Sequence, residues 1–316
     1  MENQLILRMI EKQLTLNEMA NFLWQNPREI YQEINRMKNE GYFIAPNYFD
    51  DGEVKFAQID RTTSHTIEIG LTNDDFFKAL IVSDMHIGNE CENLDYIYKA
   101  YDYARDNDIH IILNCGDLID GNFSKGGQIV TDIDKQIERV LTYYPYDRTI
   151  LNIICLGNHD YSSVECGFNM EDALLLRPDL VSAGYGISLI NIGKDQFVMK
   201  HGTSGLFGCI PNKLILKGHS HKAGVKINSN NYILNIPPLS DLCFAHQENP
   251  GMIDMRLSLS NGYIHTGYFK HLSVKDKIGV FNDICLEFNF NHEIVDEKKL
   301  IIKWLIFSTF TSPWVG

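Results

Sequence analysis

Five short polar motifs, each placed directly after an apolar run, constrain this chain more than any other feature. Such a run, for example Ala79-Leu80-Ile81-Val82, predicts a short strand that is buried on both faces. The motifs are Asp84-Met85-His86, Gly116-Asp117 with Asp120, Gly157-Asn158-His159-Asp160, His201-Gly202 and Gly218-His219-Ser220-His221. Because strand ends are rigid, side chains placed there can converge on one crevice. The sequence therefore predicts one polar site built from five scattered segments.

The order of the expected elements predicts the fold class. From residue 78 onward, apolar runs at 79–82, 109–114 and 150–156 alternate with helical periodicity at 94–105 and 133–143. After residue 186 the pattern becomes mostly strand-like, with runs at 187–192, 197–200, 214–217, 232–236 and 253–259. Strand-helix-strand units that lead into consecutive strands predict an α/β layered core.

The expected organisation has three parts. Residues 1–73 show three amphipathic helical segments and a hairpin signal around Asp50-Asp51-Gly52, a pattern that resembles a winged helix-turn-helix module. Within it, Thr15 and Glu18 form a capping box, and Asn26-Pro27 begins the third helix. Residues 74–272 form the main domain. Residues 273–316 are a C-terminal extension, either an edge of the sheet or a tail that docks elsewhere.

Charge argues against DNA as the first partner of residues 1–73. The third helix offers Arg28, Gln32, Asn35 and Arg36, which suit base edges and phosphates. However, the segment carries seven Lys and Arg against eleven Asp and Glu, and the whole chain has a formal net charge of -13. Such a surface repels a nucleic-acid backbone. A protein partner or homo-oligomerisation through residues 1–73 is the favoured expectation, with DNA binding as the alternative.

Cysteine usage and hydropathy predict a cytoplasmic protein. The seven cysteines form no paired metal-ligand spacing, and Cys115 and Cys155 fall in apolar runs, where a free thiol behaves as a small hydrophobic group. The N-terminus shows no signal-peptide pattern. The most apolar late stretch, 300–310, contains Lys303 and is too short to span a bilayer, so we expect no membrane association.

Together the five motifs supply carboxylate, imidazole and amide groups but no thiolate. This mixed nitrogen and oxygen set suits Mn²⁺, Fe or Zn²⁺. Each motif alone is weak evidence, because Gly-Asp is common in turns and a single His at a strand end is usually structural. Five of the eleven histidines nevertheless fall in these motifs. The joint pattern, more than any one motif, indicates a metal site.

The motifs resemble the signature of the calcineurin-like metallophosphoesterase superfamily, over about residues 78–270. The resemblance implies a layered β-sandwich flanked by helices (αββα) and two divalent metal ions, with Mn²⁺ expected first and Fe or Zn²⁺ as alternatives. It also implies a ligand set for each ion. One ion would be bound by Asp84, His86 and His221, the other by Asn158, His201 and His219, and Asp117 would bridge both.

The implied chemistry is hydrolysis of a phosphate ester by a hydroxide held between the metals. Two neighbouring divalent cations repel each other, so a shared anionic ligand such as Asp117 is needed. His159 is expected to protonate the leaving oxygen as general acid. Asp120 is expected to orient His159, and Asp160 is assigned only to the turn.

The sequence constrains the choice of substrate less than it constrains the metal ligands. Protein Ser/Thr phosphatases carry Arg after the second Asp of motif two and end motif three in Glu, whereas this chain has Gly121-Asn122 and Asp160. A phosphodiester, of a nucleotide or nucleic acid, is the expected substrate. A small-molecule phosphomonoester is the first alternative. The second is a DNA-binding regulatory protein with a vestigial phosphoesterase core, which the intact ligand set disfavours.

Overall fold

The computed structural model describes residues 2–12, 14–39, 44–48, 54–58, 66–71, 76–122, 127–202, 213–228, 231–241, 249–288 and 299–300. The hairpin turn expected at 50–52 and most of the apolar stretch 300–310 lie outside these residues. Within the described ranges, no helix has both the length and the hydropathy needed to cross a bilayer.

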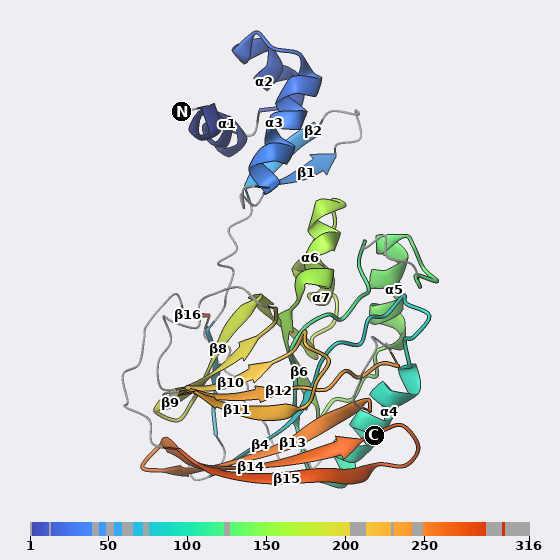
Figure 1. Ribbon diagram of the computed structural model, residues 1–316, viewed down its shortest axis with the longest axis vertical. Coiled ribbons are helices and arrows are strands. Elements are labelled where there is room, and N and C mark those ends of the chain that lie inside the picture. The colour runs from blue at the N-terminus through green and yellow to red at the C-terminus, as the bar shows by residue number, and fades with distance from the viewer. Residues whose placement is uncertain are drawn as a thin grey trace, which may run out of the picture.

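The first sheet positions three of the five motifs. Its strand order is β15-β14-β13-β4-β5-β6-β7 (Figure 1). The strands β4, β5, β6 and β7 are parallel neighbours, so their C-terminal ends lie at one edge of the sheet, whereas β13, β14 and β15 are antiparallel. The bounds are β4 Phe76–Val82, β5 Ile111–Asn114, β6 Leu151–Leu156, β7 Leu180–Tyr185, β13 Gly251–Ser260, β14 Tyr263–Ser273 and β15 Gly279–Glu287.

The second sheet positions the other two motifs. Its order is β11-β12-β10-β9-β8-β3-β16. β9 and β10 run parallel to each other, so the residues that follow them emerge side by side. The bounds are β3 Thr66–Ile69, β8 Ile187–Ile192, β9 Asp195–Lys200, β10 Lys213–Lys217, β11 Gly224–Asn228, β12 Asn231–Asn235 and β16 Lys299–Leu300.

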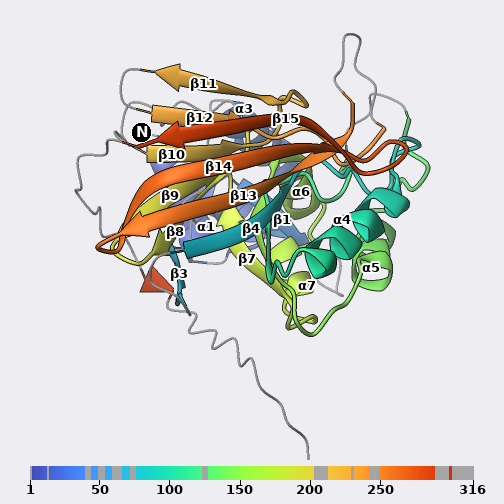
Figure 2. The same ribbon diagram turned by 90° about the horizontal axis from the view of Figure 1, so that it is seen from below.

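The two sheets pack face to face, and β4 shows how the sequence specifies this. Phe77, Ala79 and Ile81 belong to the apolar core between the sheets. Leu80 and Val82 alternate with them and belong to the core under the helices α4 (Leu94–Asp106), α5 (Ile133–Tyr143) and α7 (Met170–Leu174) (Figure 2). Both faces of β4 are therefore buried, as its continuous apolar run predicts. The predicted α/β fold with packed sheets and flanking helices is confirmed.

The helices of the core lie on the first sheet. The four that the structure describes, α4, α5, α7 and α6 (Asn158–Glu165), all pack against it. The outer face of the second sheet carries a smaller apolar cluster of strand residues, Val198, Ile215 and Ile233.

The N-terminal segment has its own small core. It contains α1 (Glu2–Glu11), α2 (Leu16–Leu23), α3 (Pro27–Asn39) and the antiparallel pair β1 (Ile44–Tyr48) and β2 (Val54–Gln58). The predicted capping box is present, since Thr15 Oγ1 accepts from Glu18 N at 3.1 Å. Asn26 Oδ1 likewise accepts from Arg28 N at 2.9 Å at the start of α3. The resemblance of this segment to a winged helix stays a prediction.

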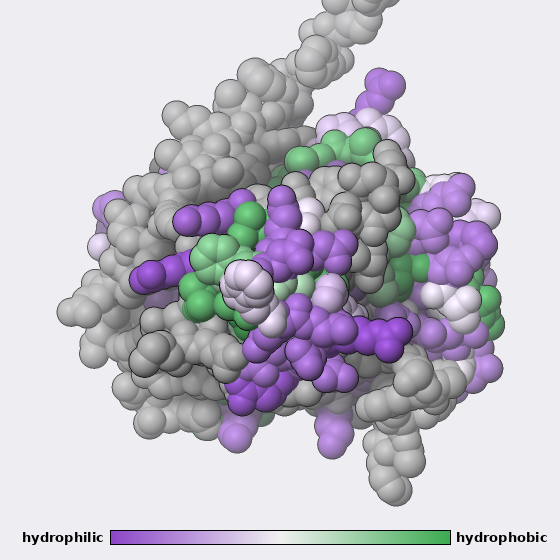
Figure 3. Space-filling view, turned by 90° about the horizontal axis from the view of Figure 1, so that it is seen from above, coloured by the Kyte–Doolittle hydropathy of each residue, from purple (hydrophilic) through white to green (hydrophobic). Residues whose placement is uncertain are grey.

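Two aromatic side chains are exposed at the end of α2. Phe22 is 64% exposed and Trp24 is 95% exposed, and Trp24 ends the helix in a left-handed conformation. In the view from above in Figure 3, the coloured residues show hydrophilic areas interspersed with hydrophobic ones. Large exposed apolar side chains such as Phe22 and Trp24 suit contact with a partner protein. That partner remains a prediction.

Two strands depart from the expected division of the chain. β3 lies in the range 1–73 predicted as the N-terminal module, but it pairs with β8 in the second sheet. β15 lies in the C-terminal extension 273–316 and forms the edge of the first sheet by pairing with β14. The core sandwich therefore begins before residue 74 and continues past residue 272. The sequence predicts two alternatives for the extension, an edge of the sheet or a tail that docks elsewhere. β15 fits the first of them.

Candidate metal centre

Five candidate ligands have a left-handed backbone. The φ angles are 55° at Asp84, 47° at His86, 54° at Asp117, 77° at His219 and 51° at His221. These are five of the eight non-glycine residues with positive φ in the described part of the chain. Each such conformation costs about 1–3 kcal/mol, and its accumulation in one place is typical of a functional site.

The first group of candidate ligands comprises Asp84, His86 and His221. One donor atom from each lies within 4.8 Å of the others. His221 Nε2 lies 3.1 Å from Asp84 Oδ1 and 3.2 Å from His86 Nε2. All three residues are buried. The structure therefore brings together the three residues that the sequence assigns to one ion.

The second group comprises Asp117, His201 and His219, again with one donor atom from each within 4.8 Å of the others. His201 Nε2 lies 2.9 Å from Asp117 Oδ2, and the rings of His201 and His219 are 5.2 Å apart between centroids. Asn158, the remaining residue assigned to this ion, is exposed at the first position of α6. Its role as a ligand stays a prediction.

A single oxygen atom connects the two groups. Asp117 Oδ2 lies 2.9 Å from Nε2 of His201, 3.8 Å from Nε2 of His86 and 4.0 Å from Nε2 of His159. His201 belongs to the second group and His86 to the first. The carboxylate of Asp117 therefore stands between imidazoles of both groups, which is the position expected of a bridging ligand.

Two of these three imidazoles, those of His201 and His159, are held through their other nitrogen, and the third has a carboxylate near its own. His201 Nδ1 lies 2.6 Å from the Cys115 carbonyl oxygen, and His159 Nδ1 lies 2.6 Å from the Asp120 carbonyl oxygen. His86 Nδ1 lies 3.4 Å from Asp120 Oδ1. With Nδ1 engaged by a carbonyl, Nε2 of His201 and of His159 is the ring nitrogen that faces Asp117. Such an oxygen partner behind the ring is the usual support of a metal-binding histidine.

Glycines allow the motifs to approach this closely. A Cβ at Gly157 would lie 2.2 Å from Asp117 Oδ1, and one at Gly116 would lie 2.4 Å from His201 Nδ1. Gly116 also has a φ of 101°, which residues with a Cβ rarely adopt. Gly116 and Gly157 are therefore needed for close packing of their motifs against the neighbouring ones.

Burial and mutual charge act in opposite directions on the ionisable groups. Burial raises the pKa of Asp117, but the imidazoles of His201, His86 and His159 lower it by more, so the net shift is downward. Burial lowers the pKa of His201, but the Asp117 carboxylate outweighs burial and raises it to about 9. At His159 burial prevails, and the pKa lies below its usual value. The buried carboxylate of Asp117 thus stays ionised and attracts positive charge.

The donor set fits divalent cations. Ring nitrogens of His86 and His221 face each other at 3.2 Å beside the carboxylate of Asp84. A divalent cation placed among these ring nitrogens and buried carboxylates would be stabilised by them and would compensate their negative charge. Imidazole and carboxylate donors without thiolate suit Mn²⁺, Fe and Zn²⁺.

Asp120 contacts His159 differently from the prediction. The sequence predicts that its side chain orients His159, but the backbone carbonyl makes the 2.6 Å contact. The carboxylate lies nearer His86 Nδ1, at 3.4 Å, than His159 Nδ1, at 3.9 Å. His86 is therefore the nearer imidazole partner of this carboxylate, and together with the neighbouring polar groups it lowers the pKa of Asp120 against the opposing effect of burial.

The first prediction concerns this carboxylate. In Asp120→Asn, we expect the affinity for metal to fall about 10- to 100-fold, the usual cost of losing the partner of a ligating histidine. At saturating metal, kcat should stay within about twofold, because the backbone contact to His159 remains. Activation by Mn²⁺ titration measures both quantities. Asp108→Asn is the control, since Asp108 Oδ1 lies 3.0 Å from His110 Nε2 outside the site. A fall in kcat with unchanged metal affinity would contradict the prediction.

Asp160 has a larger structural role than a turn residue. Its Oδ1 accepts from Leu118 N at 2.8 Å and Ile119 N at 3.0 Å, and its Oδ2 accepts from Gly157 N at 2.7 Å. It is fully buried, and burial followed by the charge of Asp117 raises its pKa to about 6. Asp160 therefore links the backbone of the segment 116–120 to the backbone of the segment 157–160. The spacing of Gly157 and Asp160 at the start of α6 is the signal for this role.

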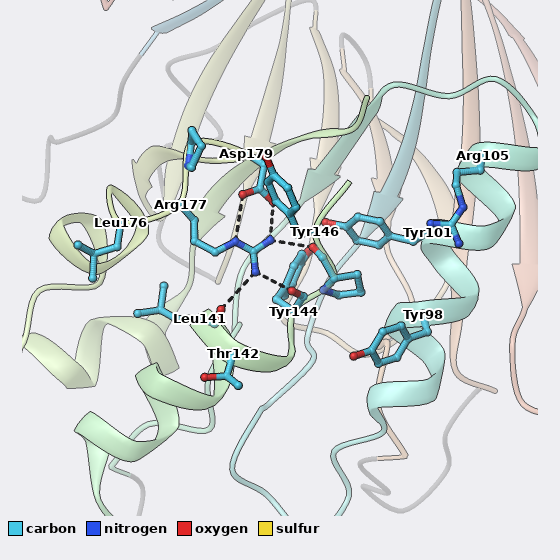
Figure 4. Close-up of a pocket in the computed structure, with 12 residues that line it drawn as sticks. Tyr98, Tyr101, Arg105, Leu141, Thr142, Tyr144, Tyr146, Leu176, Arg177 and Asp179 are labelled. Carbon is cyan, nitrogen blue, oxygen red and sulfur yellow. Dashed lines mark hydrogen bonds and ion pairs between the residues drawn. The ribbon is translucent and has the colours of Figure 1, made fainter. Parts of the chain in front are cut away.

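A separate hollow of about 640 Å³ lies at the opposite edge of the first sheet. It is lined by Tyr98, Tyr101, Arg105, Tyr144, Arg177 and Asp179, among others (Figure 4). The guanidinium of Arg177 is already occupied, because it bonds Asp179 and the carbonyls of Tyr144 and Pro145. The Arg177 guanidinium therefore links the loop that precedes β6 to the loop that precedes β7, and it is not free to bind a phosphate.

The fold and the site define a metal-dependent phosphoesterase. The chain belongs to the calcineurin-like phosphoesterase family, whose sequence profile matches residues 77–268, more than half of its length. All five motifs lie within the matched region. No curated protein sequence matches the chain.

Solved structures of phosphoesterases are among the structural matches. The phosphoesterase YfcE from E. coli is 13% identical with a TM-score of 0.42, and the match covers 66% of this chain and 98% of that one. An archaeal phosphodiesterase is 15% identical with a TM-score of 0.38 over 58% of this chain and 100% of that one. Vps29 from Entamoeba histolytica, complexed with zinc, is 15% identical with a TM-score of 0.40, and the match covers 67% of this chain and 100% of that one. At these sequence identities and TM-scores, the similarity does not indicate the substrate of this chain.

Proposed function

We propose that the chain is a phosphodiesterase with a dinuclear metal centre, in which His159 is the general acid. The observation that carries the proposal is the position of Asp117 Oδ2, which lies 2.9 Å from His201 Nε2 and 3.8 Å from His86 Nε2. An anion between two groups of nitrogen ligands suits a pair of cations. Asp84, His86 and His221 would hold one ion, His201, His219 and Asn158 the other, and Asp117 both. We expect Mn²⁺ as the metal, with Fe or Zn²⁺ as alternatives.

The chain's own residues supply the remaining requirements of hydrolysis. When bound, a pair of divalent cations lowers the pKa of water for attack on phosphorus and neutralises charge on the phosphoryl oxygens. His159 is 22% exposed at its side chain, so a substrate can reach it. Its Nδ1 is held by the Asp120 carbonyl, which leaves Nε2 directed toward the site to donate a proton to the leaving oxygen.

A diester suits the charge of the site better than a monoester. The five motif segments, residues 84–88, 116–122, 157–160, 201–202 and 218–221, contain no Lys or Arg. A monoester dianion carries one more negative charge than a diester and gains more from such cationic donors. The net charge of -13 disfavours long nucleic acids, so a nucleotide or a short strand is the proposed substrate.

The N-terminal segment is placed where it could help to hold a substrate or partner. β1 lies beside α6, the helix that begins with Asn158 and His159 (Figure 1). We propose that residues 1–73 position a partner or substrate near the metal centre. The activity is assigned to the cytoplasm, because Cys91, Cys115, Cys155, Cys166 and Cys285 are free thiols, as expected in a reducing compartment.

An assay with matched substrates tests this proposal. The purified protein, loaded with Mn²⁺ or Zn²⁺, is offered an aryl phosphodiester, the corresponding monoester and single-stranded DNA. We expect kcat/KM to be at least about tenfold higher for the diester, a difference of about 1.4 kcal/mol. His159→Ala is the control for contaminating activity. A preference for the monoester would refute the diester assignment. Absence of turnover, together with salt-sensitive retention of DNA, would instead support a regulatory DNA-binding role.

A further inference from the structure

A closed ring of hydrogen bonds joins α6 to the segment 120–122 beside the metal centre. His159 Nδ1 donates to the Asp120 carbonyl at 2.6 Å. Asn122 N donates to Ser162 Oγ at 2.8 Å, and Ser162 Oγ donates to the His159 carbonyl at 2.7 Å. The ring therefore holds His159 twice, once through its imidazole and once through its own backbone.

Gly121 is the tightest point of this ring. A Cβ at Gly121 would lie 2.2 Å from Ser162 Oγ and 2.4 Å from the His159 carbonyl oxygen, and its φ is 71°. Only glycine permits this approach. Segment 120–122 thus packs directly on the first turn of α6, and displacement of the segment would displace the support of the His159 imidazole.

Gln136 of α5 holds the same segment from another side. Its Oε1 accepts from Gly121 N at 2.8 Å, and its Nε2 donates to the Gly121 carbonyl at 3.1 Å and to the Val130 carbonyl at 2.7 Å. The side chain is fully buried. Both polar groups of Gly121 are bonded to this one buried amide, and the Gly121 carbonyl also accepts from Gln128 Nε2, so movement of the segment would break several hydrogen bonds at once, which is costly.

We propose that Ser162 and Gln136 are positioning residues that hold the His159 imidazole with Nε2 toward the leaving oxygen. This inference rests on the proposed function, in which His159 is the general acid. Neither side chain is required to touch the substrate: Gln136 acts through segment 120–122, and Ser162 acts through that segment and through the His159 carbonyl. As the bond from phosphorus to the leaving oxygen breaks, the proton on Nε2 passes to that oxygen. A displaced imidazole transfers this proton less well, because the transfer requires hydrogen-bond distance.

The dependence of kcat on the leaving group distinguishes a residue that positions His159 from one that only stabilises the fold. We compare methyl phosphodiesters of phenol and of 2,4-dinitrophenol, since dinitrophenolate leaves without protonation and phenolate benefits from it. For Ser162→Ala we expect about a tenfold loss of kcat on the phenyl ester and at most about a twofold loss on the dinitrophenyl ester. For Gln136→Met we expect the same selectivity with a larger loss on the phenyl ester. A purely structural role would lower both rates equally.

Matched controls exist for both variants. Ser163 neighbours Ser162 in α6, and its Oγ donates to the Asp160 carbonyl at 2.6 Å rather than to His159. Gln196 is also buried, and its Nε2 donates to Asn191 Oδ1 at 2.8 Å at the far end of β9. Ser163→Ala and Gln196→Met should reduce the two rates by equal factors. Metal content and Tm are measured for every variant, and Ser162→Ala should keep its metal.

The outcomes distinguish this inference from the proposed function. If His159→Ala itself loses both rates equally, the general-acid role fails and the inference fails with it. If His159→Ala is selective against the phenyl ester but Ser162→Ala and Gln136→Met are not, only the positioning roles are refuted. Selective loss in all three variants, with metal retained in Ser162→Ala, supports the proposal.

Discussion

Asp117→Ala is expected to lose both metal ions and, with them, essentially all phosphoesterase activity. The reason is the position of its Oδ2, 2.9 Å from His201 Nε2 and 3.8 Å from His86 Nε2, between the two groups of candidate ligands. Without that carboxylate, two cations held side by side would repel each other with no anion between them. The loss of affinity should exceed the roughly 100-fold cost of removing a residue outside the ligand set.

Metal analysis after dialysis against Mn²⁺ measures this loss directly, and kcat/KM on the aryl diester measures its consequence. Asp254→Ala is the matched control. Asp254 is also a fully buried carboxylate, but it bonds Tyr103 and Arg256 on the first sheet. Both variants should lose stability, whereas only Asp117→Ala should lose metal. Two ions still bound in Asp117→Ala would show that the bridging assignment is wrong.

The strands that carry the motifs could be predicted from the sequence because each is a compact apolar run. The run at 187–192 matches β8 residue for residue, and the run at 150–156 differs from β6 by one residue at its start. Continuous burial on both faces leaves a signal that does not depend on the rest of the fold. The strands β14 and β15 lack this signal. They lie toward one edge of the first sheet and mix buried with exposed positions, as the 57% exposure of Val280 illustrates.

The helix α6 could not be predicted for a different reason. Its buried side chains include Asp160, Ser162 and Ser163, so it has no apolar stripe with helical spacing. Those polar side chains are buried because they bond the backbone of neighbouring motifs, which is a tertiary property. The same holds for Asp120: its spacing from Asp117 places it near His159 and His86, but only packing decides which atom faces which ring.

The left-handed backbone of the ligands also has no direct sequence signal. Asp84 and His86 adopt it because the segment after β4 is bonded to the segment after β5. Asp84 N donates to the Gly116 carbonyl at 2.8 Å, and His86 N donates to the Asp117 carbonyl at 3.1 Å. Asp84 in turn accepts from His219 N at 3.0 Å. Backbone strain at the ligands is therefore stabilised by contacts between motifs, and cation binding to the strained residues would stabilise it further.

His159→Ala is expected to keep both metal ions but to lose most turnover on substrates whose leaving group needs a proton. His159 stands beside the two groups: its Nε2 is 4.0 Å from Asp117 Oδ2, and its Nδ1 is already engaged by the Asp120 carbonyl. Loss of a general acid costs about 10²- to 10⁴-fold in rate. We therefore expect a loss in this range on the methyl phenyl diester and a much smaller one on the dinitrophenyl diester.

Metal content and the two values of kcat, measured on the same preparation, decide between the roles open to His159. His110→Ala is the control, because His110 Nδ1, like that of His159, contacts a backbone carbonyl (Thr149), and its Nε2 contacts Asp108, but the residue lies outside the site. If His159→Ala releases an ion, His159 is a ligand and not the acid. If it keeps both ions and both rates, the proton comes from another group, since the imidazole would then be dispensable for breaking the bond to the leaving oxygen.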